Sequence, residues 1–262
     1  MQIMKYTRAE SLEEAWKANQ KRSAVILGGC CWLRLSPQRI IGEAIDLNGL
    51  GLAYITEEET QFRIGAMTTL RELETSQVLN DYTQGAMKEC VRHIVGTQFR
   101  NLATVGGSIC GRFGFSDIWT LFLSLQARVV LYKGGTMTLA EFSASGAGND
   151  ILTEVIIPKT AVRTAYASLR LNATDFPIIA CSMAVSARDL TCAVGAKPSR
   201  AQAVTIPLET VQVMTEDDLI KTCTASWKYE TNMRGSAMYR QDMAKVLCRR
   251  LWQTVKGEAS WK

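Results

Sequence analysis

The pattern of hydrophobic and polar residues predicts short strands and helices in close succession from the start of the chain. Ser11 and Glu14 have the spacing of a capping box, and apolar residues at helical spacing follow them. Apolar runs at 24–27 and 44–47 are typical of short buried strands. We therefore expect a β-α-β-like unit over residues 1–55.

The middle and the last part of the chain differ in pattern. Residues 56–160 mix strands and helices, whereas residues 161–262 begin with three successive strands and end with two amphipathic helices. The expected strands are 62–66, 128–132, 151–157, 166–171, 178–187 and 190–195, and the expected helices are 81–94, 119–125, 216–224 and 236–252. The pattern predicts an α+β protein whose C-terminal α+β unit is separate.

Composition is that of an ordinary globular protein. The 262 residues are 47% hydrophobic and 21% charged, and the basic residues behind the net charge of +5 are scattered, which argues against nucleic-acid binding. No apolar stretch approaches the ~20 residues that span a bilayer, and the first residues lack the apolar core of a secretory signal. We expect a cytoplasmic protein without a membrane span.

Eight cysteines raise the question of a metal or cluster site. None forms a C-x2-C pair, and no four have the spacing of a zinc or iron–sulfur site. We therefore expect no metal site, and most of the thiols to be small buried apolar groups. Cys30 and Cys31 are the exception, because they lie in a glycine-rich loop.

Two Gly-Gly pairs carry the candidate chemistry of the sequence. Gly28-Gly29 follows one expected strand, and Gly106-Gly107 lies in a second apolar segment. Because glycine has no Cβ, its backbone N–H groups can approach an anion closely and can line up toward it. Two such loops that converge can hold the diphosphate of a dinucleotide, although each pair by itself is also compatible with a plain tight turn.

Other catalytic signatures are missing from the sequence. Neither loop matches G-x-G-x-x-G or the P-loop pattern, which argues against a Rossmann or P-loop nucleotide site. His93 is the only histidine, and no serine lies in a G-x-S-x-G elbow. The sequence therefore predicts no catalytic side chain.

The surroundings of the second glycine pair resemble a known family. The segment 96–109, GTQFRNLATVGGSI, is similar to the signature of FAD-binding subunits in the molybdenum hydroxylase family, which includes xanthine dehydrogenase and carbon monoxide dehydrogenase. A second specific match lies at 233–240, and supporting matches at 26–29, 64–70, 116–117 and 151–158 follow the family's order along the chain. The resemblance therefore extends over nearly the whole chain.

This resemblance implies a fold and a division into domains. It implies an α+β protein with a two-subdomain FAD-binding fold of the PCMH type at 1–55 and 56–160. The remaining residues, 161–262, would form a C-terminal α+β domain with a three-stranded antiparallel sheet, as in carbon monoxide dehydrogenase flavoproteins. Arg234, Ser236, Tyr239 and Arg240 in the last match are interpreted as structural.

The resemblance also implies which residues hold FAD. Two loops would bind the diphosphate and the ribityl chain, Thr68 and Leu152 would lie along the flavin or adenine, and Asp117 would bond ribose or adenine. The predicted cofactor-binding residues are Leu27, Gly28, Gly29, Cys30, Cys31, Trp32, Leu33, Thr68, Ala103, Thr104, Gly106, Gly107, Ser108, Asp117 and Leu152. Cys30 stands where the family usually has a hydroxyl, so backbone amides must contribute more there.

The function that the resemblance implies is that of one subunit in a larger enzyme. A molybdenum-cofactor subunit would oxidise the substrate, and an iron–sulfur subunit would pass the electrons to FAD and on to NAD or another acceptor, in a heterotrimer or its dimer. Two alternatives stay open: a stand-alone flavin reductase, and a degenerate scaffold without FAD. Arg170 stands near a position where family dehydrogenases often have a lysine, so NAD reduction is in doubt.

Overall fold

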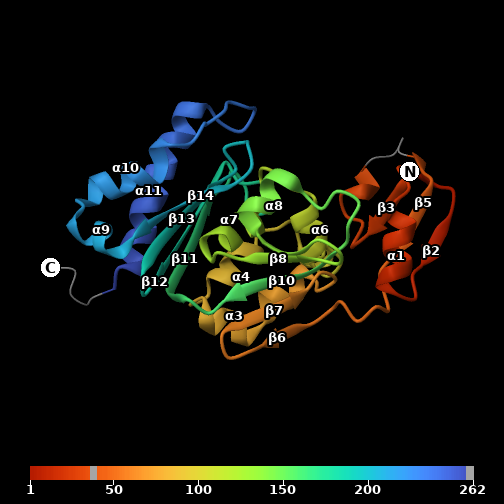
Figure 1. The fold of residues 1–262 in the computed structure, drawn as a ribbon. Helices are drawn as coiled ribbons and strands as arrows, with labels where there is room; N and C mark the ends of the chain where they lie inside the picture. The colour runs from red at the N-terminus through yellow and green to blue at the C-terminus, as the bar shows by residue number, and fades with distance from the viewer. Residues whose placement is uncertain (36–39, 258–262) are drawn as a thin grey trace. The chain divides into compact units, whose positions relative to one another are not determined.

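The computed structural model describes residues 1–35 and 40–257 (Figure 1). The chain divides into two compact units, each assembled from three separate segments. Unit 1 comprises Met1–Glu72, Thr97–Gly111 and Arg128–Ile157, and unit 2 comprises Leu73–Gly96, Arg112–Ala127 and Pro158–Lys262. Because the units interleave along the chain, the domain boundaries near residues 55 and 160 stay a prediction.

Unit 1 begins with a small parallel sheet covered by a helix. Strand β5 (Glu43–Asp46) is central and pairs in parallel with β2 (Tyr6–Arg8) and β3 (Ala24–Leu27). Helix α1 (Leu12–Asn19) contacts β3 and β5, and the hydroxyl of Ser11 accepts the N–H of Glu14 at its first turn. The expected β-α-β-like arrangement is therefore found. A further parallel pair joins β1 (Gln2–Ile3) to β4 (Ile40–Ile41).

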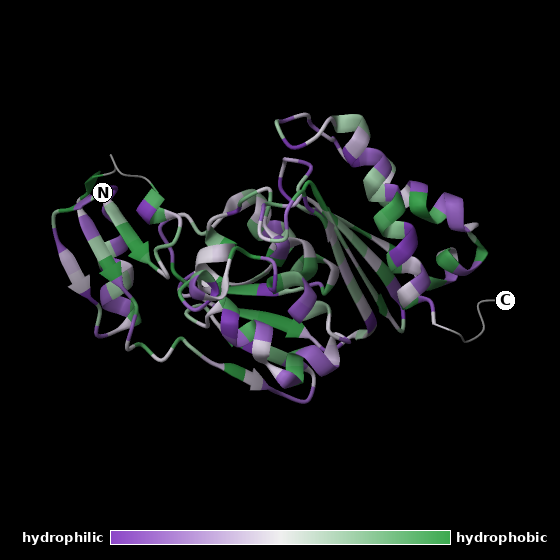
Figure 2. Cartoon of the chain, turned by 180° about the vertical axis from the view of Figure 1, so that it is seen from behind, coloured by the Kyte–Doolittle hydropathy of each residue, from purple (hydrophilic) through white to green (hydrophobic). Residues whose placement is uncertain are grey.

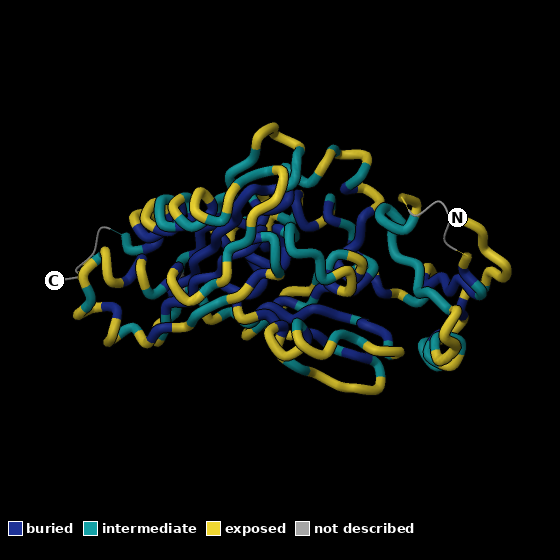
Figure 3. The backbone as a smooth tube through the Cα atoms, turned by 90° about the horizontal axis from the view of Figure 1, so that it is seen from above, coloured by how far each residue is buried: buried dark blue, intermediate teal, exposed yellow. Residues whose placement is uncertain are grey.

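The second part of unit 1 is a five-stranded sheet in the order β6-β7-β10-β8-β9. Its strands are β6 (Ile55–Glu57), β7 (Gln61–Gly65), β8 (Arg128–Leu131), β9 (Gly135–Thr138) and β10 (Leu152–Pro158). Helices α2 (Leu70–Thr75), α5 (Thr97–Arg100), α6 (Val105–Cys110) and α8 (Leu139–Ser145) complete this part of the chain. Strand β10, in the middle of this sheet, is mostly buried, whereas the β6–β7 and β8–β9 turns include exposed residues; Figure 3 colours the chain by burial.

Unit 2 is built on a four-stranded antiparallel sheet in the order β11-β12-β13-β14. Its strands are β11 (Ala161–Leu169), β12 (Ile179–Ser186), β13 (Asp189–Gly195) and β14 (Gln202–Pro207). Its helices are α3 (Gln77–Tyr82), α4 (Ala86–Val91), α7 (Asp117–Ser124), α9 (Leu208–Val213), α10 (Glu216–Ala225) and α11 (Ala237–Val255). This sheet is the scaffold of the C-terminal half.

Both faces of this sheet are covered, and the residues of β12 show how. Cys181 and Met183 belong to a core with residues of α10 and α11, whereas Ser182, between them, bonds Ser124 of α7 at 2.7 Å. Alternate residues of a strand point to opposite faces. Figure 1 accordingly shows α10 and α11 on one side of the sheet and α7 on the other. Coverage of both faces explains why β12 is buried from Ile179 to Val185 and is mostly apolar; Figure 2 gives the hydropathy along the chain.

Two details differ from the sequence prediction. The C-terminal sheet has four strands, because β14 joins as an edge strand; only Ile206 of this strand is fully buried, so its sequence gives a weak strand signal. The expected helix at 81–94 is broken, since Gln84 and Gly85 have positive φ angles of 48° and 82°. In the described parts of the chain, no helix combines the length and apolarity that crossing a membrane needs.

Candidate functional site

The first glycine pair follows the last residue of β3 and runs against the second loop. A Cβ on Gly29 would lie 1.7 Å from the carbonyl oxygen of Leu102, and one on Gly28 would lie 2.7 Å from Oγ1 of Thr104. Only glycine permits this approach at position 29, because the three nearest obstructing atoms all belong to the backbone. The two glycine loops, expected to converge from the sequence, are in contact within unit 1.

The second loop enters helix α6 with its own amides already bonded. The N–H groups of Val105 and Gly106 donate to the carbonyls of Thr68 (2.9 Å) and Ala66 (2.7 Å). Gly107 N–H donates to the Thr104 hydroxyl at 3.1 Å, which makes Thr104 the N-cap of α6. These hydrogen bonds fix the second loop to the segment after β7. The sequence predicted that the N–H groups of this loop would be free to bind an anion, but those of residues 105–107 are already bonded within the protein.

The available amides lie in the first loop instead. Within residues 1–35 and 40–257, the N–H groups of Gly28, Gly29, Cys30 and Cys31 make no hydrogen bond to a backbone carbonyl. Cys30 has a left-handed φ of 56°, a conformation in which successive N–H groups can turn toward one anion. This arrangement fits a diphosphate group.

The thiols of the first loop do not oppose an anion. The Cys30 thiol donates to the carbonyl of Gly28 (3.3 Å) and the Cys31 thiol to that of Gly29 (3.4 Å). Burial raises the pKa of both thiols above the ordinary range, so both are neutral at pH 7. The side chains fold back over the glycine pair and stiffen it, while the backbone remains the donor.

Other predicted site residues stand around these loops. Leu27 ends β3, and Leu33 begins a short 3-10 turn, η1 (Leu33–Leu35). Trp32 contacts Phe99 edge to face, with ring centroids 6.2 Å apart. Gly107 is exposed, and a Cβ placed there would meet only Oγ1 of Thr104, at 3.1 Å. Space for a ligand therefore remains beside Gly107.

Three predicted residues around the second loop are half-buried or buried within unit 1. The hydroxyl of Ser108 donates to the carbonyl of Thr104 at 3.0 Å, and Ala103 is buried beside it. Thr68 is also buried: its hydroxyl donates to the Tyr54 carbonyl (2.8 Å) and accepts the Tyr54 N–H (3.0 Å). The hydroxyls of Ser108 and Thr68 thus hold backbone, and their contacts to a cofactor stay a prediction.

Leu152 and Asp117 are likewise buried. Leu152 pairs with Leu131 in the five-stranded sheet of unit 1. Asp117 begins α7 in unit 2, where its carboxylate accepts the Tyr166 hydroxyl and forms an ion pair with Arg170. Burial raises the pKa of Asp117, and the nearby positive charge of Arg170 opposes this shift. Sequence reasoning missed this network, although polar residues within two apolar segments were a signal for it.

The C-terminal element has the structural contacts that we expected for it. The Arg240 guanidinium is buried and donates to the carbonyls of Ile178 and Ala196, the latter at 2.6 Å. The Ser236 hydroxyl accepts the N–H of Tyr239 and caps α11. Arg240 therefore ties the start of α11 to the sheet of unit 2.

The remaining cysteines lie mostly in the core. Cys90, Cys181, Cys192, Cys223 and Cys248 are buried, as expected, whereas Cys110 is exposed. The sulfurs of Cys192 and Cys248 are 3.7 Å apart within the core of unit 2. In the part of the chain that the structure describes, no three His, Cys, Asp or Glu side chains are arranged as ligands of one metal ion.

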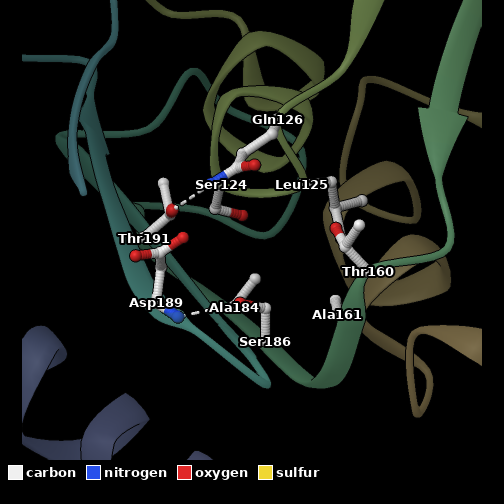
Figure 4. Close-up of a pocket in the computed structure, with 9 residues that line it drawn as sticks. All are labelled: Ser124, Leu125, Gln126, Thr160, Ala161, Ala184, Ser186, Asp189 and Thr191. Carbon is white, nitrogen blue, oxygen red and sulfur yellow. Dashed lines mark hydrogen bonds between the residues drawn. The ribbon is translucent and has the colours of Figure 1, made fainter. Parts of the chain in front are cut away.

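A small polar cavity lies elsewhere in unit 2, near the end of α7 (Figure 4). Its wall includes the side chains of Ser124, Gln126 and Thr191, and the Gln126 amide donates to the Thr191 hydroxyl at 3.0 Å. The cavity volume is about 10 Å³, which corresponds to roughly one water molecule. This cavity is too small for a dinucleotide.

Comparison with known proteins agrees with the geometry of the loops. The chain is 24% identical to the glyceraldehyde dehydrogenase medium chain of Sulfolobus acidocaldarius, over 95% of this chain and 97% of that relative. It is 29% identical to the nicotinate dehydrogenase FAD-subunit of Eubacterium barkeri, over 53% of this chain and 51% of the relative. These similarities extend beyond the glycine loops.

The fold also matches solved structures. A chain in the crystal structure of Cu,Mo-CO dehydrogenase superimposes with a TM-score of 0.83 and 23% identity, covering 98% of this chain and 99% of that one. A chain of quinoline 2-oxidoreductase from Pseudomonas putida 86 gives a TM-score of 0.82 at 19% identity, with 97% of both chains covered. The family model for the FAD binding domain in molybdopterin dehydrogenase matches residues 2–160. The chain therefore belongs to the family of FAD-binding subunits of molybdopterin dehydrogenases.

Proposed function

We propose that this chain is the flavin subunit of a multi-subunit molybdenum hydroxylase and passes electrons through FAD. The observation that carries the proposal is the contact between the two glycine loops, where a single methyl group on Gly29 would lie 1.7 Å from a backbone oxygen. This contact leaves the N–H groups of the half-buried first loop, which bond no backbone carbonyl of the described residues, beside the fixed second loop. A diphosphate fits such an edge, because it accepts several hydrogen bonds at once.

In this proposal the two loops make different contributions to cofactor binding. The amides from Gly28 to Cys31 donate to the diphosphate, while Gly106 and Gly107 keep the opposite side free of side chains. Leu27, Trp32 and Leu33 supply apolar surface beside the first loop. Thr68, Ala103, Thr104, Ser108 and Leu152 complete the proposed cofactor-binding set within unit 1. A contact of Asp117, which belongs to unit 2, with the cofactor stays a prediction from the sequence.

The chemistry belongs to the cofactor, and the chain's residues orient it. When bound, FAD supplies the two-electron and one-electron redox steps that amino-acid side chains lack. The chain contributes directional N–H donors, neutral thiols and a backbone that packing has already fixed. Such a site needs no general acid or base, in keeping with a sequence in which we identify no catalytic side chain.

The proposed partners are an iron–sulfur subunit, which delivers electrons, and a molybdenum-cofactor subunit, which oxidises the substrate. The names of two relatives support this view, because the glyceraldehyde dehydrogenase relative is a medium chain and a second relative is the nicotine 6-hydroxylase medium subunit of Paenarthrobacter nicotinovorans. This second relative is 23% identical over 94% of this chain and 95% of its own length. NAD or another acceptor would take the electrons in the cytoplasm. Residues 1–55 and 56–160 would form the two parts of the FAD-binding fold, and 161–262 the third domain.

The visible spectrum of the purified chain tests the proposal. We expect flavin absorption bands from the chain alone, and iron and molybdenum subunits when it is purified with its complex. A colourless chain that takes up no added FAD would support the scaffold alternative. A yellow chain that reduces an acceptor without any partner would support the stand-alone reductase.

A single substitution locates the diphosphate. In Gly107→Val the added side chain would extend from an exposed position where, among the described residues outside the backbone of α6, a Cβ meets Oγ1 of Thr104 at 3.1 Å. We expect a folded protein that no longer retains flavin. Full FAD occupancy in this variant would show that the second loop does not border the cofactor.

A further inference from the structure

The first glycine loop offers hydrogen-bond donors, but its own side chains bring no positive charge. Cys30 and Cys31 are neutral thiols that bond backbone carbonyls. Neutral amide donors hold a diphosphate less strongly than charged donors do, because hydrogen bonds to charged donors are roughly twice as strong. The residues near this loop therefore decide how much charge the site presents.

One carboxylate near the loop has the wrong sign for an anion site. The negative charge of Asp46 acts on Cys30 and raises the pKa of its thiol. Asp46 is buried at the end of β5, and it accepts the Tyr6 hydroxyl (2.5 Å) and the Asn48 N–H (2.8 Å). These two hydrogen bonds hold the Asp46 carboxylate at the end of β5. An anion that binds at the first loop would therefore need a positive group nearby to offset the negative charge of Asp46.

Among the described residues, Arg34 brings a positive charge to this loop. Its backbone N–H donates to the carbonyl of Cys30 at 3.0 Å, so the η1 turn folds Arg34 back toward the loop. The charge of Arg34 acts on both thiols and lowers the pKa of each against the effect of burial. Arg34 is exposed, and in residues 1–35 and 40–257 its guanidinium forms no ion pair with a carboxylate.

We propose that Arg34 binds the diphosphate of the cofactor and makes the site selective for phosphorylated flavins. This inference rests on the proposed function, since it assigns a residue to the same FAD site. An arginine suits the role, because its planar guanidinium can bond two phosphate oxygens side by side. The first loop would then combine directional amides with one mobile charge that becomes ordered when the phosphate is present.

FAD and riboflavin titrations of the full chain test this proposal. Flavin is removed first, and quenching of flavin fluorescence then gives the dissociation constants for wild type, Arg34→Gln and Arg34→Lys at low and high salt. We expect Arg34→Gln to weaken FAD binding by about 10- to 100-fold, the range for loss of a charge-assisted hydrogen bond. Riboflavin, which has no phosphate, should bind all variants equally.

Salt dependence and a control variant make the result specific. Wild-type FAD affinity should fall as salt rises, and that slope should shrink in Arg34→Gln, because salt screens an exposed charge. Arg34→Lys should recover part of the affinity. Arg22→Gln is the matched control: Arg22 is also an exposed arginine of unit 1, but it precedes β3, whereas the loop follows this strand.

Each outcome bears on one of the two proposals. Unchanged FAD affinity in Arg34→Gln, or an equal loss for FAD and riboflavin, would overturn the role of Arg34 while leaving the flavin subunit intact. Failure of the wild-type chain to bind FAD at all would overturn the proposed function itself. Unfolding curves of the flavin-free variants check that all of them are folded, as expected for changes at exposed positions.

Discussion

Replacing Gly29 by alanine should force the two glycine loops apart. The new Cβ would lie 1.7 Å from the oxygen and 2.4 Å from the carbon of the Leu102 carbonyl, and 2.9 Å from Cα of Ala103. A carbon and a carbonyl oxygen normally approach no closer than about 3.3 Å, so the backbone must move by roughly 1.6 Å. All three obstructing atoms belong to the backbone, and no side-chain rotation can relieve the clash.

The size of the effect follows from this displacement. Overpacking in a well-packed region costs about 1–3 kcal/mol, and a backbone clash belongs at the upper end of that range. We therefore expect Gly29→Ala to lower the free energy of unfolding by about 3 kcal/mol and to weaken FAD binding more than tenfold. The loss of affinity follows because the first loop's amides would no longer face the second loop.

Gly107→Ala is the matched control for this prediction. Its Cβ would meet only Oγ1 of Thr104 at 3.1 Å, and alanine within a helix is favoured over glycine by up to about 1 kcal/mol. The stability of this variant should therefore stay near that of wild type. Urea unfolding of the flavin-free proteins and FAD titration measure both effects. If Gly29→Ala is as stable as wild type and binds FAD equally well, the two loops do not pack in the way that we describe.

Two further predictions concern charged groups. Hydrogen bonds from Lys21 and Lys5 lower the pKa of Glu43 to about 2, below its ordinary value of 4.5. The ionised carboxylate therefore stabilises the fold fully above about pH 4.5, and this stabilisation is lost as the pH falls toward 2. Glu43→Gln should flatten the stability profile in that window, measured by urea unfolding, and an unchanged profile would contradict the assignment. Asp117→Asn leaves the buried guanidinium of Arg170 without its counter-charge and should cost about 3–5 kcal/mol in thermal unfolding. The double variant with Arg170→Met should recover much of that loss, and additive losses would argue against a direct pair.

Local patterns predicted much of the fold because short-range rules govern those parts. The capping residue Ser11 and the apolar run 24–27 both lie where helix and strand rules put them. The edge strand β14 was missed, because one face of an edge strand tolerates polar residues and its apolar pattern is weak. The break at Gln84 and Gly85 was also missed, since a helical apolar stripe continues on both sides of it.

The two glycine loops of the candidate site were predictable from the sequence, but their hydrogen bonds were not. The glycine pairs were visible in the sequence, and so was the need for a close approach. Which amides are free was not visible, because the partners of Val105 and Gly106 are Thr68 and Ala66, which only the folded chain brings alongside them. The same holds for Asp117, whose partners lie about 50 residues further along the chain, at separations of 49 and 53 residues.

By itself, the sequence determined many of the helices and strands, the two glycine loops and the family resemblance, because each depends on residues that are close together along the chain. Tertiary structure alone decided that Gly29 lies against the Leu102 carbonyl, and that the N–H groups of the second loop are already bonded while those of the first are not. The physical reason is that the hydrogen-bond partners of a group, its burial and the charges near it all depend on its surroundings in the folded protein. Those surroundings include segments that are distant in the sequence and come into contact only when the chain folds.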